Sequence, residues 1–339
     1  TSESIGALPE IYTLTANGKE ADIQVMAGDE VTLAYTGRKA DGAGSQGVDL
    51  VEQRFGMKCS TLPFENPQSF SVAFWLKINK LAAGETQLLA VANKLDAWPK
   101  TDWGWIWSNI DETGQITSFT WRGTDATNNN ELQYKYENTK LPVGNWVHIA
   151  YTFDYNATGG FRGEFYVNGV KQKVTKWKRA TDANFKNTEP GYEPNVYTIT
   201  DGQVLSVGGS AHGRNGIDGV LDNFQIWDCV MTPEEVALSM GDFVAGEYPE
   251  HLLSLWDFET QAGGTKTFRS VGKKRLLAGA HTYTASGSEG QGTFKWITPE
   301  YSSGCPFIAG TAYPVTTVPT WKAKKAVISE ESGNDQAGS

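Results

Sequence analysis

The chain has 339 residues, of which 39% are hydrophobic and 12% aromatic, and its formal net charge is −10. This apolar content excludes a disordered protein, and the length allows either one large β-domain with extra material or two smaller domains. An acidic chain without a basic run argues against nucleic acid as a partner, and the lack of an apolar stretch of ~20 residues argues against a transmembrane segment.

The first part of the chain, residues 1–45, is predicted to be an N-terminal β extension. It contains two β-like runs, 10–15 and 21–35, and ends in a glycine-rich turn at 41–44. The chain starts at Thr1 rather than Met, which predicts that an upstream segment has been removed. A signal peptide or a lipoprotein leader would fit. We therefore expect a secreted or cell-surface protein, with a lipid anchor if the leader is of the second kind.

The region 46–243 carries the strongest strand signals. Apolar residues alternate with smaller or polar ones at 70–78 and again at 146–153. An alternation with period two is typical of a strand that has one face in the core. The same reasoning predicts strands at 203–207 and 220–227.

A β-hairpin is predicted at Asn168-Gly169. Both residues tolerate positive φ, which makes this dipeptide the strongest two-residue hairpin signal. It would join a strand at 164–167 to a returning strand at 170–177.

One helix is well marked in this region. Thr232 is a suitable N-cap, Pro233 occupies the first helical position and Glu235 lies three residues after the cap. This capping box predicts a short helix of about two turns. Many strands with one late, short helix favour an antiparallel sandwich over a parallel α/β sheet.

The last part of the chain, 250–322, starts with an apolar run at 252–259 and then becomes rich in turns. It either forms a C-terminal β-rich unit of its own or completes the central sandwich. The tail at 323–339 is polar, and we expect it to be mobile.

The chain has three cysteines, and their spacing matches no metal site. Cys59 and Cys229 fall on the predicted first and last strands of the central region. A disulfide between these two and a set of three free thiols that includes Cys305 both remain open.

Three segments of the central region carry recognisable motifs. They read FSVAFWLK at 70–77, NWVHIA and EFYVNG between 145 and 169, and IDGVLDNFQIW at 217–227. In this order they resemble laminin-G-like domains of the concanavalin A-like lectin/glucanase superfamily. The resemblance covers about 46–243 and implies an antiparallel jelly-roll sandwich. The wider chain, chiefly at 90–107 and after residue 250, also resembles surface proteins of gut Bacteroidetes that belong to glycan-use systems.

The segment 98–107, WPKTDWGWIW, is the most unusual in the chain. In a strand that begins at Trp103, the side chains of Trp103, Trp105 and Trp107 share one face. Indole rings stack on the C–H faces of sugars, and the resembled fold binds sugars on its concave sheet. The alternative is that these rings face inward and form core, as large aromatic side chains commonly do. Neighbours in the sequence that would complete a glycan site are Trp121, Arg122 and Tyr134.

Domains of the resembled superfamily often carry a structural Ca²⁺ where the first and last strands meet. The resemblance singles out Asp222, which we expect on the same face as Phe224 and Ile226, an odd place for an unpaired carboxylate. Calcium needs a shell of several oxygens, so Asp49 would have to help. The alternative is an aspartate that accepts backbone N–H bonds without a metal.

A catalytic pattern is harder to find. The glucanases of the superfamily carry Glu-x-Asp-x-x-Glu on one strand. Glu20 and Asp22 begin this pattern, but Val25 stands where the second glutamate should be. The isolated His148, on a predicted strand, is interpreted as structural.

These observations favour a non-catalytic carbohydrate-binding or adhesion module whose partner is a poly- or oligosaccharide. A glycoside hydrolase or lyase with an unrecognised carboxylate pair is the first alternative, because such enzymes normally need two carboxylates across the scissile bond. A scaffold that only holds partner proteins is the second.

Overall fold

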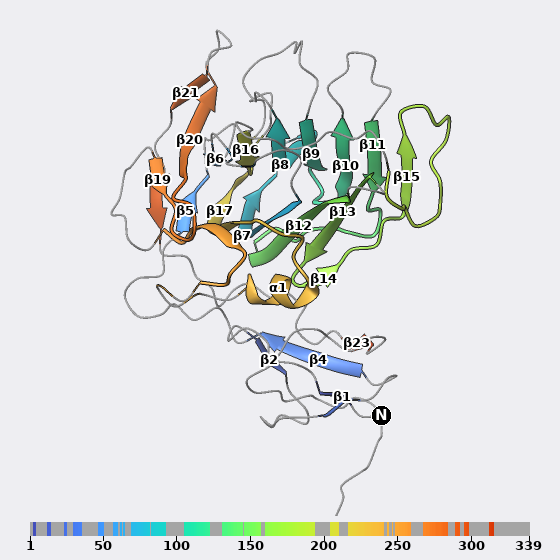
Figure 1. Ribbon diagram of the computed structural model, residues 1–339, viewed down its shortest axis with the longest axis horizontal. Helices are drawn as coiled ribbons and strands as arrows, with labels where there is room; N and C mark the ends of the chain where they lie inside the picture. Colours follow the sequence, from blue (N-terminus) through green and yellow to red (C-terminus); the bar gives the residue numbers. More distant parts are fainter. Residues whose placement is uncertain are drawn as a thin grey trace, which may run out of the picture.

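The computed structural model describes a β-rich protein (Figure 1). The residues that it describes are 3–4, 12–14, 24–25, 30–35, 47–50, 57–59, 62, 64, 69–81, 83–92, 105–122, 131–144, 146–156, 160–193, 204–209, 216–240, 243, 246, 248–258, 267–283, 289–291, 295–297 and 312–314. The predicted tail at 323–339 and Cys305 lie outside these ranges.

The N-terminal part contributes strands to two small antiparallel sheets. One pairs β1 (Glu3–Ser4) with β3 (Gln24–Val25). The other has the order β2 (Tyr12–Leu14), β4 (Glu30–Tyr35) and β23 (Ala312–Pro314). Strands therefore occur in both of the β-like runs predicted for this part.

Two larger antiparallel sheets form a sandwich. The strands of the ten-stranded sheet are β6 (Met57–Cys59), β8 (Thr86–Ala92), β9 (Trp105–Ile110), β10 (Ile116–Arg122), β11 (Glu131–Lys135), β15 (Lys176–Arg179), β16 (Val204–Val207), β19 (Thr267–Arg269), β20 (Leu277–Tyr283) and β21 (Glu289–Gln291). Their order is β15-β11-β10-β9-β8-β16-β6-β20-β19, and β21 pairs with β20.

The strands of the eight-stranded sheet are β5 (Gly47–Asp49), β7 (Phe70–Lys80), β12 (Trp146–Asn156), β13 (Gly160–Val167), β14 (Val170–Lys171), β17 (Asp218–Trp227), β18 (Leu252–Trp256) and β22 (Lys295–Ile297). Their order is β14-β13-β12-β7-β17-β5-β22, and β18 pairs with β17. The predicted fold class, an antiparallel all-β sandwich, is confirmed.

The strongest sequence signals belong to the centre of the eight-stranded sheet. The predicted strands at 70–78, 146–153 and 220–227 correspond to β7, β12 and β17, which are neighbours in the sheet. The hairpin is also confirmed, because Asn168 and Gly169 have φ values of 54° and 79° between β13 and β14. Positive φ at both central residues is what such a two-residue turn requires.

The returning strand predicted at 170–177 is wrong as a single element. Only Val170–Lys171 continues the hairpin, and Lys176–Arg179 pairs with β11 in the other sheet. The chain crosses between the sheets at 172–175, where Gln172 N–H donates to the Phe165 carbonyl and Thr175 N–H to the Lys135 carbonyl. Alternation continues through such a crossing, so the sequence pattern did not reveal it.

The core lies between the inward faces of the two sheets. Its aromatic part includes Phe119 and Trp121 of β10, with ring centroids 4.1 Å apart. Gly163 of β13 makes room for the Trp121 indole, because a Cβ atom at this position would lie 2.3 Å from Trp121 Cζ2. This contact joins the two sheets at one point of the core.

The eight-stranded sheet is covered on its second face as well, by α1 (Pro233–Leu238) and the residues that follow it (Figure 1). The predicted capping box is present: Thr232 Oγ1 accepts from Glu235 N–H at 3.2 Å, and Glu235 Oε1 accepts from Thr232 N–H at 3.1 Å. Within the described ranges, no helix has the length and apolar character needed to span a bilayer.

Buried polar side chains attach α1 to this sheet. Trp75 Nε1 donates to the Met240 carbonyl at 2.9 Å, and Gln225 Nε2 donates to the Ser239 carbonyl at 2.8 Å. His148 is fully buried, with its Nε2 at 3.1 Å from the same Ser239 carbonyl oxygen. The position of His148 agrees with the structural role predicted for it.

Five of the six described strands of 250–322, β18 to β22, join the two sheets of the sandwich, whereas β23 pairs with β4 in the small sheet. β18 and β22 pair with β17 and β5 in the eight-stranded sheet, and β20 pairs with β6 in the ten-stranded sheet. β18 to β22 therefore extend the two sheets of the sandwich.

Candidate functional site

The outer face of the ten-stranded sheet is partly exposed along β11. Burial alternates along β11, where Leu132 and Tyr134 are buried while Glu131, Gln133 and Lys135 are partly exposed. The exposed set therefore points away from the core. Residues paired across neighbouring strands point to the same side of a sheet. The alternation in β11 therefore identifies the outward-facing residues of the neighbouring strands as well.

Trp107 lies on this outer face and is partly exposed. Its neighbours Ile106 and Ser108 are buried, and Ser108 Oγ accepts a hydrogen bond from the core residue Tyr151 at 3.0 Å. Of the two orientations left open for the tryptophans, Trp107 therefore has the outward one.

A row of side chains extends from Trp107 toward one edge of the sheet. Trp107 is paired with Thr120 of β10, Thr120 with Gln133 of β11, and Gln133 with Lys178 of β15. We call these four residues the Trp107 row. Gln133 Nε2 lies 3.4 Å from Thr120 Oγ1, a weak contact that leaves the amide able to bind a ligand. Thr120 is itself buried, so the groups of the row that a ligand can reach are an indole, an amide and an ammonium group.

Two residues predicted for a glycan site face the other way. Trp121 and Tyr134 are fully buried in the core, with ring centroids 4.7 Å apart. They alternate with the outward residues Thr120 and Gln133, so the strand geometry sends them inward. In this structure neither ring can contact a ligand on the outer face, and both are corrected to core positions.

The other residues predicted for that site are only partly described. Trp105 and Arg122 are backbone partners at the ends of β9 and β10, and their side chains lie outside the described part of the structure. Trp103 lies outside it altogether. Sequence reasoning missed Gln133 and Lys178, although the alternation at 131–135 was a usable signal for Gln133.

Asp222, the candidate calcium ligand, is fully buried but not on the predicted face. It is paired with Trp75, whereas Gln225 is paired with Ala73, so a β-bulge intervenes. Asn223, with φ at 44°, is part of this bulge. Asp222 therefore points to the side of Trp75, under α1, while Phe224 and Ile226 point into the core. The shared face predicted for these three residues is wrong.

The surroundings of Asp222 explain part of its burial without a metal. Its Oδ1 accepts from the Asn223 N–H at 2.7 Å. Asp49 is paired with Val220, two residues before Asp222. Among the described side chains, no group of three or more His, Cys, Asp and Glu residues could hold a metal ion. Calcium at Asp222 and Asp49 stays a prediction.

Several carboxylates gather on the outer face of the eight-stranded sheet, near its β13 edge. Glu164 Oε1 accepts from Arg162 Nε at 2.7 Å, and Glu189 lies 3.5 Å from the same guanidinium. Tyr192 donates its hydroxyl proton to Asp154. Two acids on one face is what hydrolysis of a glycosidic bond needs, but these carboxylates already serve as ion-pair and hydrogen-bond acceptors.

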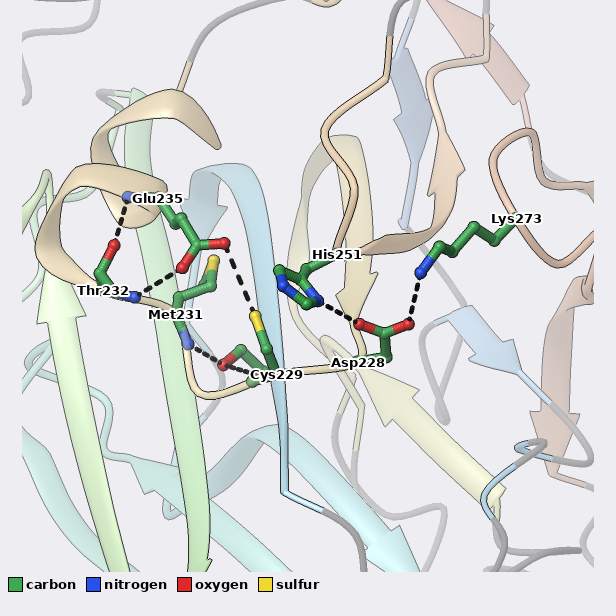
Figure 2. Close-up of polar contacts among 8 residues, drawn as sticks. Asp228, Cys229, Met231, Thr232, Glu235, His251 and Lys273 are labelled. Atoms are coloured by element: carbon green, nitrogen blue, oxygen red, sulfur yellow. Dashed lines mark hydrogen bonds and ion pairs between the residues drawn. The ribbon is translucent and has the colours of Figure 1, made fainter.

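A second polar group lies at the end of β17, next to α1 (Figure 2). Asp228 accepts from His251 Nδ1 at 3.0 Å and from Lys273 Nζ at 3.1 Å. Cys229 points instead toward Glu235, whose Oε2 lies 3.6 Å from the sulfur. Burial, reinforced by the charge of Glu235, raises the pKa of the Cys229 thiol to about 12. The Cys229 sulfur faces Glu235 and His251 Nδ1 faces Asp228, so the thiol and the imidazole have different partners.

Both described cysteines are free thiols. Cys59 is paired with Leu205 in the ten-stranded sheet, whereas Cys229 follows the last residues of β17 in the eight-stranded sheet. The disulfide that the sequence left open is therefore absent between these two residues.

Comparison with solved structures finds distant likenesses. A candidate carbohydrate-binding protein from Bacteroides ovatus is 12% identical, with a TM-score of 0.46 over 81% of this chain and 70% of that one. The heptameric SAP-like pentraxin of Limulus polyphemus is 15% identical, with a TM-score of 0.32 over 63% and 82%. The CBM40 of the Ruminococcus gnavus IT-sialidase, bound to α2,3-sialyllactose, is 11% identical, with a TM-score of 0.34 over 53% and 96%.

The family comparison is more direct. No curated protein sequence matches the chain. The sequence profile of a laminin-G-like family within the concanavalin A-like lectin/glucanases superfamily matches residues 55–237, more than half of the chain. This range runs from β6 to α1 and contains the Trp107 row. The chain therefore belongs to the concanavalin A-like lectin/glucanase superfamily.

Proposed function

We propose that this protein is a non-catalytic carbohydrate-binding or adhesion module, and that it binds a poly- or oligosaccharide on the outer face of its ten-stranded sheet. The observation that carries the proposal is the outward, partly exposed indole of Trp107. The description of the superfamily, which names lectins and glucanases, supports the same class of ligand.

The chemistry of the Trp107 row suits a sugar ring. An indole offers a flat apolar surface to the C–H bonds on one face of a pyranose. The Gln133 amide can both donate to and accept from hydroxyl groups, and it lies two strands away from Trp107. One exposed ring and one amide give modest affinity, so we expect several successive sugar units to be bound along the row.

The positions of the grouped carboxylates also favour binding over hydrolysis. Asp154 and Glu164 are on β12 and β13, in the sheet that does not carry the Trp107 row. A glycan lying across Trp107 would not contact them. The glycoside hydrolase or lyase alternative therefore gains no support from this carboxylate group.

The expected setting of the protein follows from the sequence and is part of the proposal. We place it outside the cell or on the cell surface, in a glycan-use system like those of gut Bacteroidetes. The resemblance at 90–107 and after residue 250 supports this setting. Detection of the protein at the surface of intact cells by protease shaving would test it.

Affinity electrophoresis tests the binding function. Native gels containing single neutral or anionic polysaccharides should retard the wild-type protein in at least one case. Trp107→Ala should abolish that retardation. Tyr192→Ala is the matched control, because Tyr192 is also an exposed aromatic residue, with 41% of its surface accessible, but lies outside the ten-stranded sheet. Unchanged retardation of Trp107→Ala, or no retardation by any polysaccharide of a broad panel, would contradict the proposal.

Calcium is tested separately. If Asp222 and Asp49 hold a structural Ca²⁺, the melting temperature of the chelator-treated protein should rise when calcium is restored, because a ligand that binds only the folded state stabilises it. Asp222→Asn should remove this response. An identical melting temperature with calcium and with chelator would argue against the metal.

A further inference from the structure

The Trp107 row ends in a group of cations at the corner where β11 meets β15. The chain as a whole has a net charge of −10, so a local excess of positive charge is unusual for it. Five cations lie at this corner: Lys135, Lys176, Lys178, Arg179 and Lys186. Their ion pairs divide them into two kinds.

Three of the five have a carboxylate partner. Lys176 Nζ lies 2.9 Å from Glu137, Lys186 Nζ lies 3.1 Å from Asp182, and Arg179 is paired with Glu193. The charges of these three side chains are therefore balanced locally, in two exposed pairs and in one pair with the buried Glu193.

The other two, Lys135 and Lys178, form what we call the lysine pair. Among the described residues, neither ammonium group lies within ion-pair distance of a carboxylate. Both lie instead over the ring of Phe185, with their Nζ atoms 5.7 Å and 4.9 Å from its centroid. Both ammonium groups thus lie over the same aromatic ring, at distances where each is attracted to it.

The electrostatic surroundings of Lys135 agree with this geometry. Burial lowers the pKa of Lys135 below its ordinary value, and the positive charge of Lys178 lowers it further, against the opposite effects of Glu85 and Glu137. A bound anion between the two ammonium groups would remove their repulsion.

The lysine pair and the Trp107 row lie on the same face. Lys178 is itself the last member of the row, and Lys135 lies two residues from Gln133 along β11. Trp107 and Lys178 are three strands apart, which corresponds to roughly 14 Å at the usual strand spacing. A short oligosaccharide can cover this distance.

We infer that the natural ligand of this surface is an anionic polysaccharide, with a sugar ring on Trp107 and a carboxylate or sulfate group between Lys135 and Lys178. The inference rests on the proposed function and adds the class of substrate. An ammonium group binds either anion as a point charge, so the two sources share one chemistry. Binding should weaken as salt rises, because part of it is a screened attraction between charges.

Matched polymers separate the two anions from the sugar backbone. Dextran and dextran sulfate differ only in sulfate, and methyl-esterified and de-esterified homogalacturonan differ only in free carboxylates. We expect the wild-type protein to bind the charged member of at least one pair at least tenfold more tightly than the neutral member. The pair that shows this difference identifies the anion.

Single substitutions then locate the site. Lys135→Gln and Lys178→Gln should each weaken binding of the charged polymer several-fold, and the double variant should bind the two members of the pair alike. Lys273→Gln is the matched control, because it removes the same charge from an exposed lysine that is paired with Asp228 and follows β19, at the end of the sheet order opposite β15. Circular dichroism and the melting temperature establish that each variant is folded.

The outcomes keep this inference apart from the proposed function. In one outcome Trp107→Ala abolishes binding, but the wild-type protein and the double variant each bind charged and neutral polymers equally well. The inference of an anionic ligand is then wrong, and the proposed glycan-binding function stands. If Lys273→Gln loses as much binding as the lysine pair variants, the attraction is a general charge effect and the inference is also wrong. If neither member of either pair binds and the broader panel is negative too, both proposals fail.

Discussion

The two sheets of this sandwich differ in which part of the outer face is buried. In the eight-stranded sheet, Ser71, Ala73 and Trp75 alternate with the core residues of β7, and all three are nevertheless at most 1% exposed because α1 and its flanking chain cover them. In the ten-stranded sheet, Gln133 and Lys135 alternate with core residues of β11 and remain partly exposed. Ala90, Thr120 and Ser206 on the same outer face are buried, so the surface that the ten-stranded sheet offers to a ligand is the partly exposed strip from Trp107 to β11 and β15.

The largest effect on stability is expected for a substitution of Trp75. Trp75 and Trp107 can be compared directly, because each sheet has one of these two tryptophans on its outer face. Trp75 is 1% exposed, and its Nε1 donates to the Met240 carbonyl. We expect Trp75→Ala to lower the free energy of unfolding by about 3–5 kcal/mol, measured by urea denaturation, because it leaves a cavity and an unpaired carbonyl. If this variant does not fold, Trp75→Phe should show a smaller loss.

The contact between the two sheets is tested by Gly163→Ala. A methyl group here would meet the Trp121 indole, so the sheets would have to separate or the ring would have to move. The expected loss of unfolding free energy is about 1–3 kcal/mol. Gly191→Ala is the control, because a Cβ atom at Gly191 meets no heavy atom within 4 Å. Equal melting temperatures for the two variants would contradict the packing described for Trp121.

The cover on the eight-stranded sheet is tested at the helix cap. Thr232→Ala removes the side-chain acceptor for the Glu235 N–H and should cost about 1 kcal/mol, measured by chemical denaturation. Thr232→Ser keeps the hydroxyl group and should retain most of this stability. A loss as large for Ser as for Ala would mean that the methyl group, not the cap, is what matters.

The smallest effect on stability is expected for Trp107→Ala. Its ring is partly exposed on the outer face, so its removal leaves no closed cavity, and the free energy of unfolding should fall by less than about 1 kcal/mol. The same variant should lose glycan binding. A loss of stability comparable to that of Trp75→Ala would show that the two sheets are not as different as described.

The sequence predicted the fold well where local chemistry decides it. The alternation at 70–78, the Asn168-Gly169 turn and the Thr232 cap all depend on neighbouring residues, and all are present in the structure. Residues 170–177 do not form one strand, because Lys176–Arg179 pairs with β11 in the other sheet. No local sequence pattern predicts that pairing.

The candidate site was predicted less well, for two physical reasons. Alternation shows that two faces differ but not which one is buried, so Trp121 was assigned to the surface although it alternates with the outward Thr120. A β-bulge reverses the alternation without any reliable mark in the sequence, and the bulge at Asn223 moved Asp222 to the opposite face from Phe224. Lys135 and Lys178 come together only because β11 pairs with β15. This is tertiary structure, which the local sequence does not predict.

The position of the earliest sandwich strands has a consequence for how the protein folds. β5 is paired on one side with β17 and on the other with β22, and Cys59 in β6 is paired with Leu205 on one side and Ala278 on the other. Such distant pairings carry a large loop-closure cost and slow the search for the native topology. During synthesis, the strands around residues 47–59 would wait with unpaired edges until the segment near 280–297 has emerged. The folding nucleus is therefore expected around the hairpin of β12 and β13, which are adjacent in the chain, and closure of the sandwich by β20 and β22 is expected as the slow, aggregation-exposed last step.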